Sequence, residues 1–64
     1  NVSVADAWAK LKPSDRNILA LFAFEGLSVN QLATTLEISA NTASARLGRA
    51  RKKFAEYLNS DLSD

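Results

Sequence analysis

The chain has 64 residues, a formal net charge of +1 at pH 7, and neither cysteine nor histidine. This length supports one small domain whose hydrophobic core leaves little stability in reserve. The composition excludes disulfide bridges and the usual zinc sites, and it fits a reducing compartment. No apolar run approaches the roughly 20 residues of a membrane span, and no signal peptide is visible. We therefore expect a cytoplasmic domain with no metal, no cofactor and no membrane contact.

Hydrophobic periodicity and helix caps predict helices throughout and no strands. The expected fold class is all-α, a small four-helix domain with helices at about residues 4–12, 15–25, 29–36 and 40–58. The tail, 59–64, is polar apart from one leucine, and we expect it to fray. Methionine is absent even from position 1. We therefore expect a fragment or processed product that lacks an upstream domain.

The first helix is bounded by a capping serine and a proline. Ser3 can cap its N-terminus, and Pro13 ends it, because the residue before a proline is pushed out of the α region. Val4, Trp8 and Leu11 lie at positions i, i+4 and i+7, which places them on one helix face. This spacing predicts that the three side chains face the core, with Trp8 as an anchor; the alternative role for Trp8 is contact with a partner.

The second helix is predicted to begin at Ser14 as its N-cap. Its core face is expected to consist of three large apolar residues: Ile18, Leu21 and Phe22. Leu19 and Phe24 are predicted to turn away from that face. Exposed, they would be candidates for contact with another protein, although we expect the first helix to cover them. Gly26 follows the helix, where a left-handed backbone carries no Cβ penalty.

The last two helices are both predicted to begin after a serine. Ser28 and Gln31 form the capping box S-x-x-Q, and Ser39 can cap the fourth helix with Thr42 nearby. The fourth helix has a thin apolar seam at spacings of 4, 3 and 4, made of Ala43, Leu47, Ala50 and Phe54. The opposite face is small, polar and cationic: Asn41, Ala45, Gly48 and Lys52, flanked by Ser44 and Arg49.

The basic residues are unevenly distributed along the chain. Five of the eight lie between positions 46 and 53, whereas the acidic residues are spread throughout. Such a layout suggests a surface that binds a polyanion. The alternative is a solvated face near a helix C-terminus, where the macrodipole favours cations. Charge alone leaves both interpretations open.

Residues 29–47 have the pattern of a helix-turn-helix. A short helix carries the small Ala33 where a second helix must cross closely, and the apolar Ile38 follows the turn. A four-helix bundle could place an alanine at a crossing for the same reason. Glu37 occupies the turn position where glycine or asparagine often supplies a positive φ. A left-handed Glu37 would cost about 1 kcal/mol or more, unless the turn adopts another geometry.

These residues resemble region 4, the C-terminal DNA-binding domain of bacterial RNA polymerase sigma factors, and most closely the extracytoplasmic-function group. The resemblance covers roughly positions 5–58. The shared motifs are Leu-Lys-Pro at 11–13 with an arginine at 16, Glu-Gly-Leu-Ser at 25–28, an alanine at 33, Ile-Ser-x-x-Thr at 38–42, and Arg-Leu-x-Arg-Ala-Arg at 46–51. The last run is the specific part, because other helix-turn-helix families share the rest.

The resemblance implies that the fourth helix recognises the −35 promoter element in the major groove. It also implies that the N-terminal helices dock on the β-subunit flap of RNA polymerase, that an anti-sigma factor can cover the same surfaces, and that the protein works in the cytoplasm at the bacterial nucleoid. The family's base-facing positions correspond to Ser44, Ala45 and Gly48, where larger side chains are frequent. The expected DNA-binding residues are Asn41, Thr42, Ser44, Ala45, Arg46, Gly48, Arg49 and Lys52.

Within that set, the side chains have different expected partners. Asn41, Thr42 and Ser44 can reach base edges or phosphates, and Ala45 can contact a thymine methyl group. The three cations, Arg46, Arg49 and Lys52, are assigned to phosphates. Arg46 could instead pair with an acidic residue of the third helix. For Arg16 we expect an acidic partner on a neighbouring helix rather than DNA.

Two other interpretations remain open at this stage. The effector domain of a quorum-sensing-type response regulator shares the Gly-Leu-Ser junction and the Ile-Ser-x-x-Thr turn, but usually carries a histidine and a Lys-Leu pair late in its recognition helix. A protein-interaction module could use the basic helix against an acidic protein without touching DNA. An enzyme is not expected, because the chain has no histidine, cysteine, paired inward carboxylates or phosphate loop.

Overall fold

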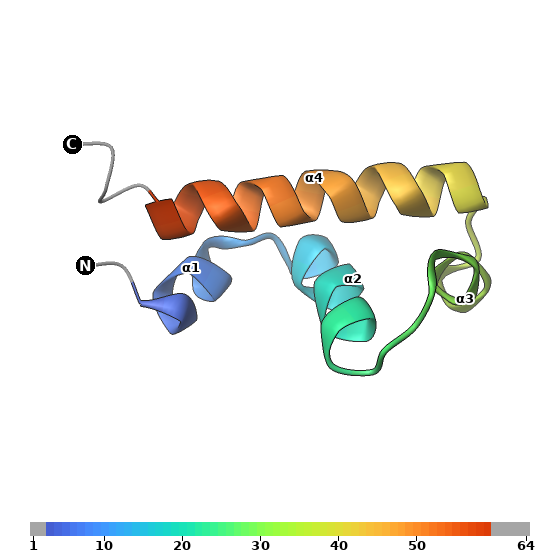
Figure 1. Cartoon of the computed structure of the whole chain (residues 1–64), viewed down its shortest axis with the longest axis horizontal. Coiled ribbons are helices and arrows are strands. Elements are labelled where there is room, and N and C mark those ends of the chain that lie inside the picture. Colours follow the sequence, from blue (N-terminus) through green and yellow to red (C-terminus); the bar gives the residue numbers. More distant parts are fainter. Residues whose placement is uncertain (1–2, 60–64) are drawn as a thin grey trace.

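The computed structural model describes residues 3–59, which form four helices and contain no strand. The helices are α1 (Val4–Lys10), α2 (Pro13–Ala23), α3 (Val29–Leu36) and α4 (Ala40–Asn59). α4 runs the length of the molecule on one side, and α1, α2 and α3 follow one another along the other side (Figure 1). The predicted all-α fold is therefore confirmed. Asn59 still belongs to α4, and the remainder of the predicted frayed tail, 60–64, lies outside the described residues.

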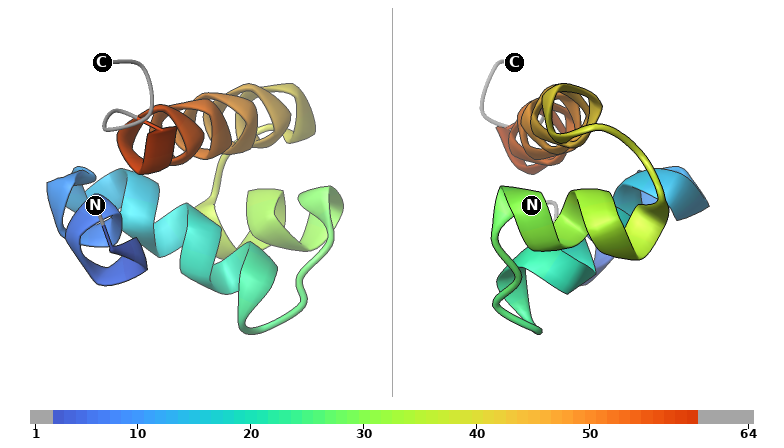
Figure 2. Two further views of the ribbon diagram at one scale, coloured as in Figure 1. Left: turned by 60° about the vertical axis from the view of Figure 1, so that its left-hand side comes forward. Right: turned by 90° about the vertical axis from the view of Figure 1, so that its right-hand side faces the viewer.

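The apolar seam of α4 is the surface on which the other helices pack. Ala43, Leu47 and Ala50 are buried, and Phe54 is partly buried against the same core, as predicted. α4 contacts α1, α2 and α3 along this seam, and Figure 2 shows it crossing above them. Two of the buried seam residues are alanines, so neighbouring helices can approach closely. The opposite face of α4 remains uncovered.

The boundaries of α1 and α2 differ from the prediction. α1 ends at Lys10 with the buried Leu11 as its C-cap. α2 begins at Pro13, so its N-cap is Lys12 and not Ser14. The reason is that a proline at the first helical position has a suitable φ, and its missing N–H would have had no partner there. Lys12 makes no capping hydrogen bond through its side chain.

The buried face of α2 is also rotated relative to the prediction. Leu19, expected to face away, is only 6% exposed and joins Ile18 in the core. Phe22, expected inside, lies at the surface, and Phe24 is 75% exposed. α2 packs mainly against α3 and α4, and the Trp8 ring of α1 meets Phe24 without covering it. The expectation that α1 covers Phe24 is therefore wrong.

α1 faces the core through Ala7 and Trp8, whereas Val4 is exposed, contrary to the prediction. The Trp8 ring lies 5.9 Å from that of Phe24 and 5.8 Å from that of Phe54, the second pair meeting edge to face. Aromatic pairs of this kind contribute about 0.5–1.5 kcal/mol beyond their buried area. Trp8 therefore anchors α1 to the ends of α2 and α4.

Three of the predicted serine caps are present. The Ser28 N–H donates to Gln31 Oε1 at 2.8 Å, and the Gln31 N–H donates to Ser28 Oγ at 3.2 Å, which completes the capping box. Ser3 Oγ accepts the N–H of Asp6 at 3.1 Å. Ser39 Oγ accepts the N–H of Thr42 at 3.1 Å just before α4. These caps fix where α1, α3 and α4 begin.

The turn between α3 and α4 holds backbone strain. Glu37 is left-handed, with φ 57° and ψ 46°. The Ile38 N–H donates to the Ala33 carbonyl at 2.9 Å and the Glu37 N–H to the Thr34 carbonyl at 3.3 Å, which are the two bonds of a Schellman motif. A non-glycine residue in this conformation costs roughly 1–2 kcal/mol. Gly26, with φ 71°, makes the other left-handed turn without that cost, as predicted.

Replacing Glu37 with glycine should stabilise the domain. Relief of the left-handed strain outweighs the greater freedom of glycine in the unfolded chain, so we expect a net gain of about 0.5–1 kcal/mol. Thermal unfolding followed by circular dichroism should show a Tm higher by a few degrees. Glu56→Gly, on the exposed face of helical α4, is the matched control and should lower stability by about 1 kcal/mol. Equal losses in both variants would contradict the assigned turn geometry.

Candidate nucleic-acid interface

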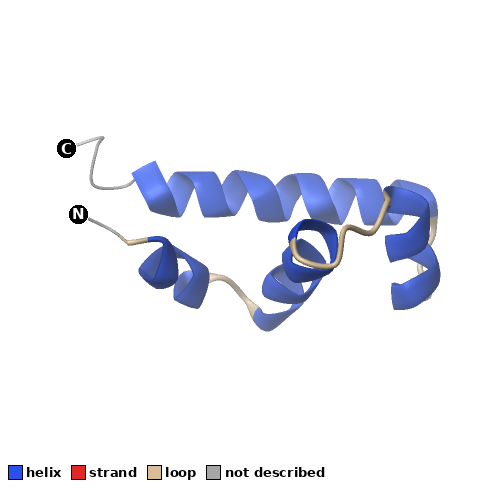
Figure 3. Ribbon diagram, turned by 60° about the horizontal axis from the view of Figure 1, so that its bottom comes forward, coloured by secondary structure: helices blue, strands red, loops and turns tan. Residues whose placement is uncertain are grey.

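The helix-turn-helix consists of α3, the strained turn and the first half of α4. Leu32 and Ala33 of α3 are buried in one core with Ala43 and Leu47 of α4. α3 lies across the N-terminal end of α4, as Figure 3 shows. Because the small Ala33 and Ala43 both belong to this core, the two helices can approach closely, as predicted. α4 then projects its opposite face outward.

The outward face of α4 carries nearly all of the predicted DNA-binding residues. Seven of the eight are exposed: Asn41, Ser44, Ala45, Arg46, Gly48, Arg49 and Lys52. The eighth, Thr42, is partly covered, and its Oγ1 accepts a hydrogen bond from the Ser39 hydroxyl at 2.8 Å. Apart from Gly48 itself, its two chain neighbours and the nearby backbone of α4, no atom of the described residues lies within 4 Å of a Cβ built on Gly48. These eight residues form the outward strip of α4. Its side chains are small along the centre of the strip, so the helix backbone is accessible there.

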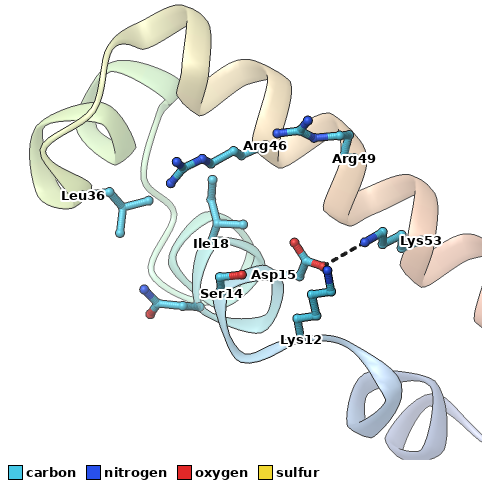
Figure 4. Close-up of a pocket in the computed structure, with 9 residues that line it drawn as sticks. Lys12, Ser14, Asp15, Ile18, Leu36, Arg46, Arg49 and Lys53 are labelled. Atoms are coloured by element: carbon cyan, nitrogen blue, oxygen red, sulfur yellow. Dashed lines mark ion pairs between the residues drawn. The ribbon is translucent and has the colours of Figure 1, made fainter.

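A basic pocket lies between α4 and the N-terminal half of α2 (Figure 4). Arg46, Arg49 and Lys53 reach it from α4, around a cavity of about 340 Å³. On the other side, Asp15 belongs to α2 and Lys12 is the N-cap just before that helix. Arg46 forms no ion pair with any residue from 3 to 59, so the predicted alternative of an acidic partner on α3 is not formed. Four positive charges and one negative charge therefore meet along this edge of α4.

The contribution of Lys12 was missed by the sequence analysis. Its backbone is the N-cap of α2, directly before Pro13, and this places the lysine beside α4. A lysine immediately before a proline that starts a helix is the only signal that could have indicated it. Lys53 also lines this pocket, and its Nζ lies 3.8 Å from Asp15 Oδ2.

Other cations are held away from the outward strip. Arg51 lies over the Phe22 ring at 5.8 Å, and Lys10 lies over the Tyr57 ring at 5.9 Å. Arg16 donates from Nη1 to the Ala9 carbonyl at 3.3 Å, so the expected acidic partner is wrong. The carbonyl of Ala9 lies in the last turn of α1, where carbonyls lack helical partners and can accept such a bond.

A second surface lies on the side of the α4 seam opposite to the basic pocket. An apolar groove of about 730 Å³ runs between α1, the end of α2 and the C-terminal half of α4. Its lining is almost entirely apolar and includes Val4, Trp8, Phe22, Phe24, Phe54 and Leu58. Phe24, 75% exposed, and the partly exposed Phe22 contribute aromatic surface to it. The molecule thus presents a cationic edge and an apolar groove on opposite sides of one helix.

Residues 3–59 contain no group of three or more His, Cys, Asp or Glu side chains arranged to hold a metal ion. In the same part of the chain, none of the helices combines the length and the apolar character needed to cross a bilayer. α4 has 20 residues, but its outward face is polar and basic. The exposed chemistry of α4 is that of a helix meeting an anionic or polar partner.

The orientation of α4 can be tested with one substitution on each face. Ala43→Leu forces a larger side chain into the crossing with α3 and should destabilise the domain by about 1–3 kcal/mol. Ala45→Leu, on the outward strip, should change stability by less than about 0.5 kcal/mol. Urea unfolding measures both. Similar losses in the two variants would contradict the assignment of buried and exposed faces.

Comparison with known proteins agrees with this geometry. Residues 2–54 match the model of the family described as Sigma-70, region 4. The RNA polymerase sigma factor CnrH of Cupriavidus metallidurans is 34% identical over 58 residues, which cover 91% of this chain and 30% of that protein. The chain therefore spans less than a third of this relative's length, and no solved structure matches it. With its helix-turn-helix and the family match over most of its length, the chain belongs to the sigma-70 region 4 family.

Proposed function

We propose that this chain recognises the −35 element of bacterial promoters as part of an RNA polymerase sigma factor, with α4 lying in the major groove. The observation that carries the proposal is the outward strip of α4, small along its centre and cationic along one edge. A major groove admits one α-helix, and little side-chain bulk lets the backbone come close to the base edges. Family membership and the similarity to an RNA polymerase sigma factor support the same function.

The side chains of the strip divide into two roles under this proposal. Asn41 and Ser44 face base edges, where an asparagine can make a bidentate contact with adenine, and Ala45 contacts a thymine methyl group. Thr42 Oγ1 already accepts a hydrogen bond from the Ser39 hydroxyl, and its remaining hydrogen-bonding capacity is used for a base or a phosphate. Gly48 adds no side chain, and this lets the helix approach the groove floor.

Phosphate contacts are assigned to Arg46, Arg49 and Lys52. They position the helix on the duplex without selecting a sequence. Three such contacts alone correspond to weak binding, in the range of about 10⁻⁴ to 10⁻⁶ M typical of non-specific complexes. Sequence preference must then come from Asn41, Ser44 and Ala45. A selection from randomised duplexes, with Asn41→Ala as the comparison, would identify the bases that are recognised.

Loss of one phosphate contact should be visible in the salt dependence of binding. We expect Arg49→Ala to make the slope of log K against log salt shallower by about 0.9. Fluorescence anisotropy on short duplexes across a salt series measures the slope. Lys10→Ala removes the same charge from α1, where the lysine lies over Tyr57, and should leave the slope unchanged. Binding that does not vary with salt would rule out the proposed mechanism.

We infer that the apolar groove is the surface that docks on RNA polymerase, through the β-subunit flap. The groove and the outward strip lie on different sides of α4, so DNA and polymerase can be bound together. Exposed aromatic rings are typical anchors of protein interfaces. An anti-sigma factor that covers the groove would separate the domain from polymerase. Under this proposed function, the protein works in the bacterial cytoplasm, at the nucleoid.

Truncating an exposed ring tests the docking surface. Phe24→Ala should weaken binding to an isolated β-flap fragment by about tenfold or more, as expected for an aromatic anchor. DNA affinity and its salt slope should not change, because Phe24 is remote from the outward strip. Thr35→Ala, exposed on α3, is the control for surface substitutions. Unchanged flap binding by Phe24→Ala would exclude this groove as the docking site.

The two other interpretations are not favoured. The family match is to sigma region 4 and not to the effector domain of response regulators, and the His and Lys-Leu features of that effector domain are missing. A module that binds only proteins would need anchors on the basic helix, yet the outward strip of α4 carries no aromatic residue. If the chain bound an acidic protein but no duplex at low salt, this last interpretation would replace the proposed function.

A further inference from the structure

The basic pocket between α2 and α4 contains a carboxylate among its cations. Four cationic side chains line this pocket together with Asp15: Lys12, Arg46, Arg49 and Lys53 (Figure 4). The proposed function assigns two of these side chains, Arg46 and Arg49, to DNA phosphates. The negative charge of Asp15 therefore lies beside the place where a backbone phosphate would bind.

The pairing of Asp15 with Lys53 is loose. Lys53 Nζ lies 3.8 Å from Asp15 Oδ2, beyond the range of a hydrogen bond. Oδ2 is buried and accepts no hydrogen bond from a protein group of residues 3–59. The two side chains differ in exposure, 41% for Lys53 and 18% for Asp15. A buried carboxylate oxygen without a hydrogen bond is unusual in native proteins, and its presence calls for an explanation other than a tight clamp between helices.

We propose that Asp15 acts as an internal competitor of the DNA backbone at this pocket. In the free domain its carboxylate attracts Lys53 and offsets part of the positive charge of Arg46 and Arg49. When the duplex binds, Lys53 exchanges the loosely paired carboxylate for a phosphate oxygen of the backbone, with which its ammonium group can form a charge-assisted hydrogen bond. Asp15 thereby lowers the affinity of α4 for DNA of any sequence. This inference rests on the proposed function.

The accessible partner of the pair is the one that must move. Lys53 is the more exposed of the two, and its long, flexible stem can redirect the ammonium group without any change in the helices. Asp15 is fixed as the third residue of α2 and is largely covered. The exchange therefore requires a rotamer change at one side chain and no rearrangement of the fold.

The size of the effect follows from Coulomb's law. A unit charge about 4 Å from a phosphate changes affinity by roughly fivefold even at the dielectric constant of water. Asp15→Asn should therefore bind a 20-base-pair duplex of mixed sequence about three to ten times more tightly than wild type at low salt. Its salt slope should be steeper by about 0.9, because the positive charge of Lys53 is then no longer offset by a carboxylate beside the DNA backbone. The advantage should shrink as salt increases.

The test measures anisotropy of that duplex with wild type, Asp15→Asn and Asp15→Ser, each checked for folding by circular dichroism. Asp6→Asn is the matched control: it removes the same charge from the exposed first turn of α1, away from the pocket. Adding Lys53→Ala to Asp15→Asn should return the slope to the wild-type value. If Asp15→Asn does not fold, Asp15→Ser replaces it in the test, because it removes the same charge.

Three outcomes would overturn the inference. If wild type binds the duplex and both neutral variants at position 15 bind it no more tightly, the role of Asp15 is excluded while the proposed function stands. An equal gain in duplex affinity for Asp6→Asn would show that the net charge of the domain, and not the position of Asp15 in the pocket, causes the tighter binding. Wild type that binds no duplex at low salt would remove the proposed function, and the competition with it.

Discussion

Everything in this domain depends on the close packing of α4 through a narrow, alanine-rich seam. Ala43 and Ala50 are fully buried, so α2 and α3 can approach α4 at short range. A thin buried stripe on a 20-residue helix leaves most of its circumference free. That freedom lets one helix serve three purposes: it forms the core, displays a small polar strip, and borders an apolar groove.

The features of the fold that arise within a few neighbouring residues were predictable from sequence. The capping box of Ser28, the Ser39 cap and the seam of α4 depend on contacts at spacings of three or four residues, and all are present. The burial of Leu19 was not predictable in this way. Which face of α2 is covered depends on where α3 and α4 lie across it, and that placement is a property of the whole core.

The candidate site shows the same division. Once the seam of α4 is known, the opposite strip follows from helical geometry, and seven of its eight proposed residues are exposed. Whether they touch DNA remains a prediction. The pocket formed by Lys12, Asp15 and Lys53 could not be foreseen, because it requires the start of α2 to lie beside the middle of α4. The strained turn at Glu37 was predictable only in part: its position was identified from sequence, but its left-handed geometry required the structure.

The position of Trp8 has a spectroscopic consequence. It is the single tryptophan of the chain, and its ring lies in the apolar groove against Phe24 and Phe54. Indole emission responds to the polarity around the ring, so the intrinsic fluorescence of this chain reports on one location only. A ligand that fills the groove changes that signal, whereas a ligand on the outward strip of α4 leaves the surroundings of the indole as they were. The protein thus carries its own optical label for distinguishing its two surfaces.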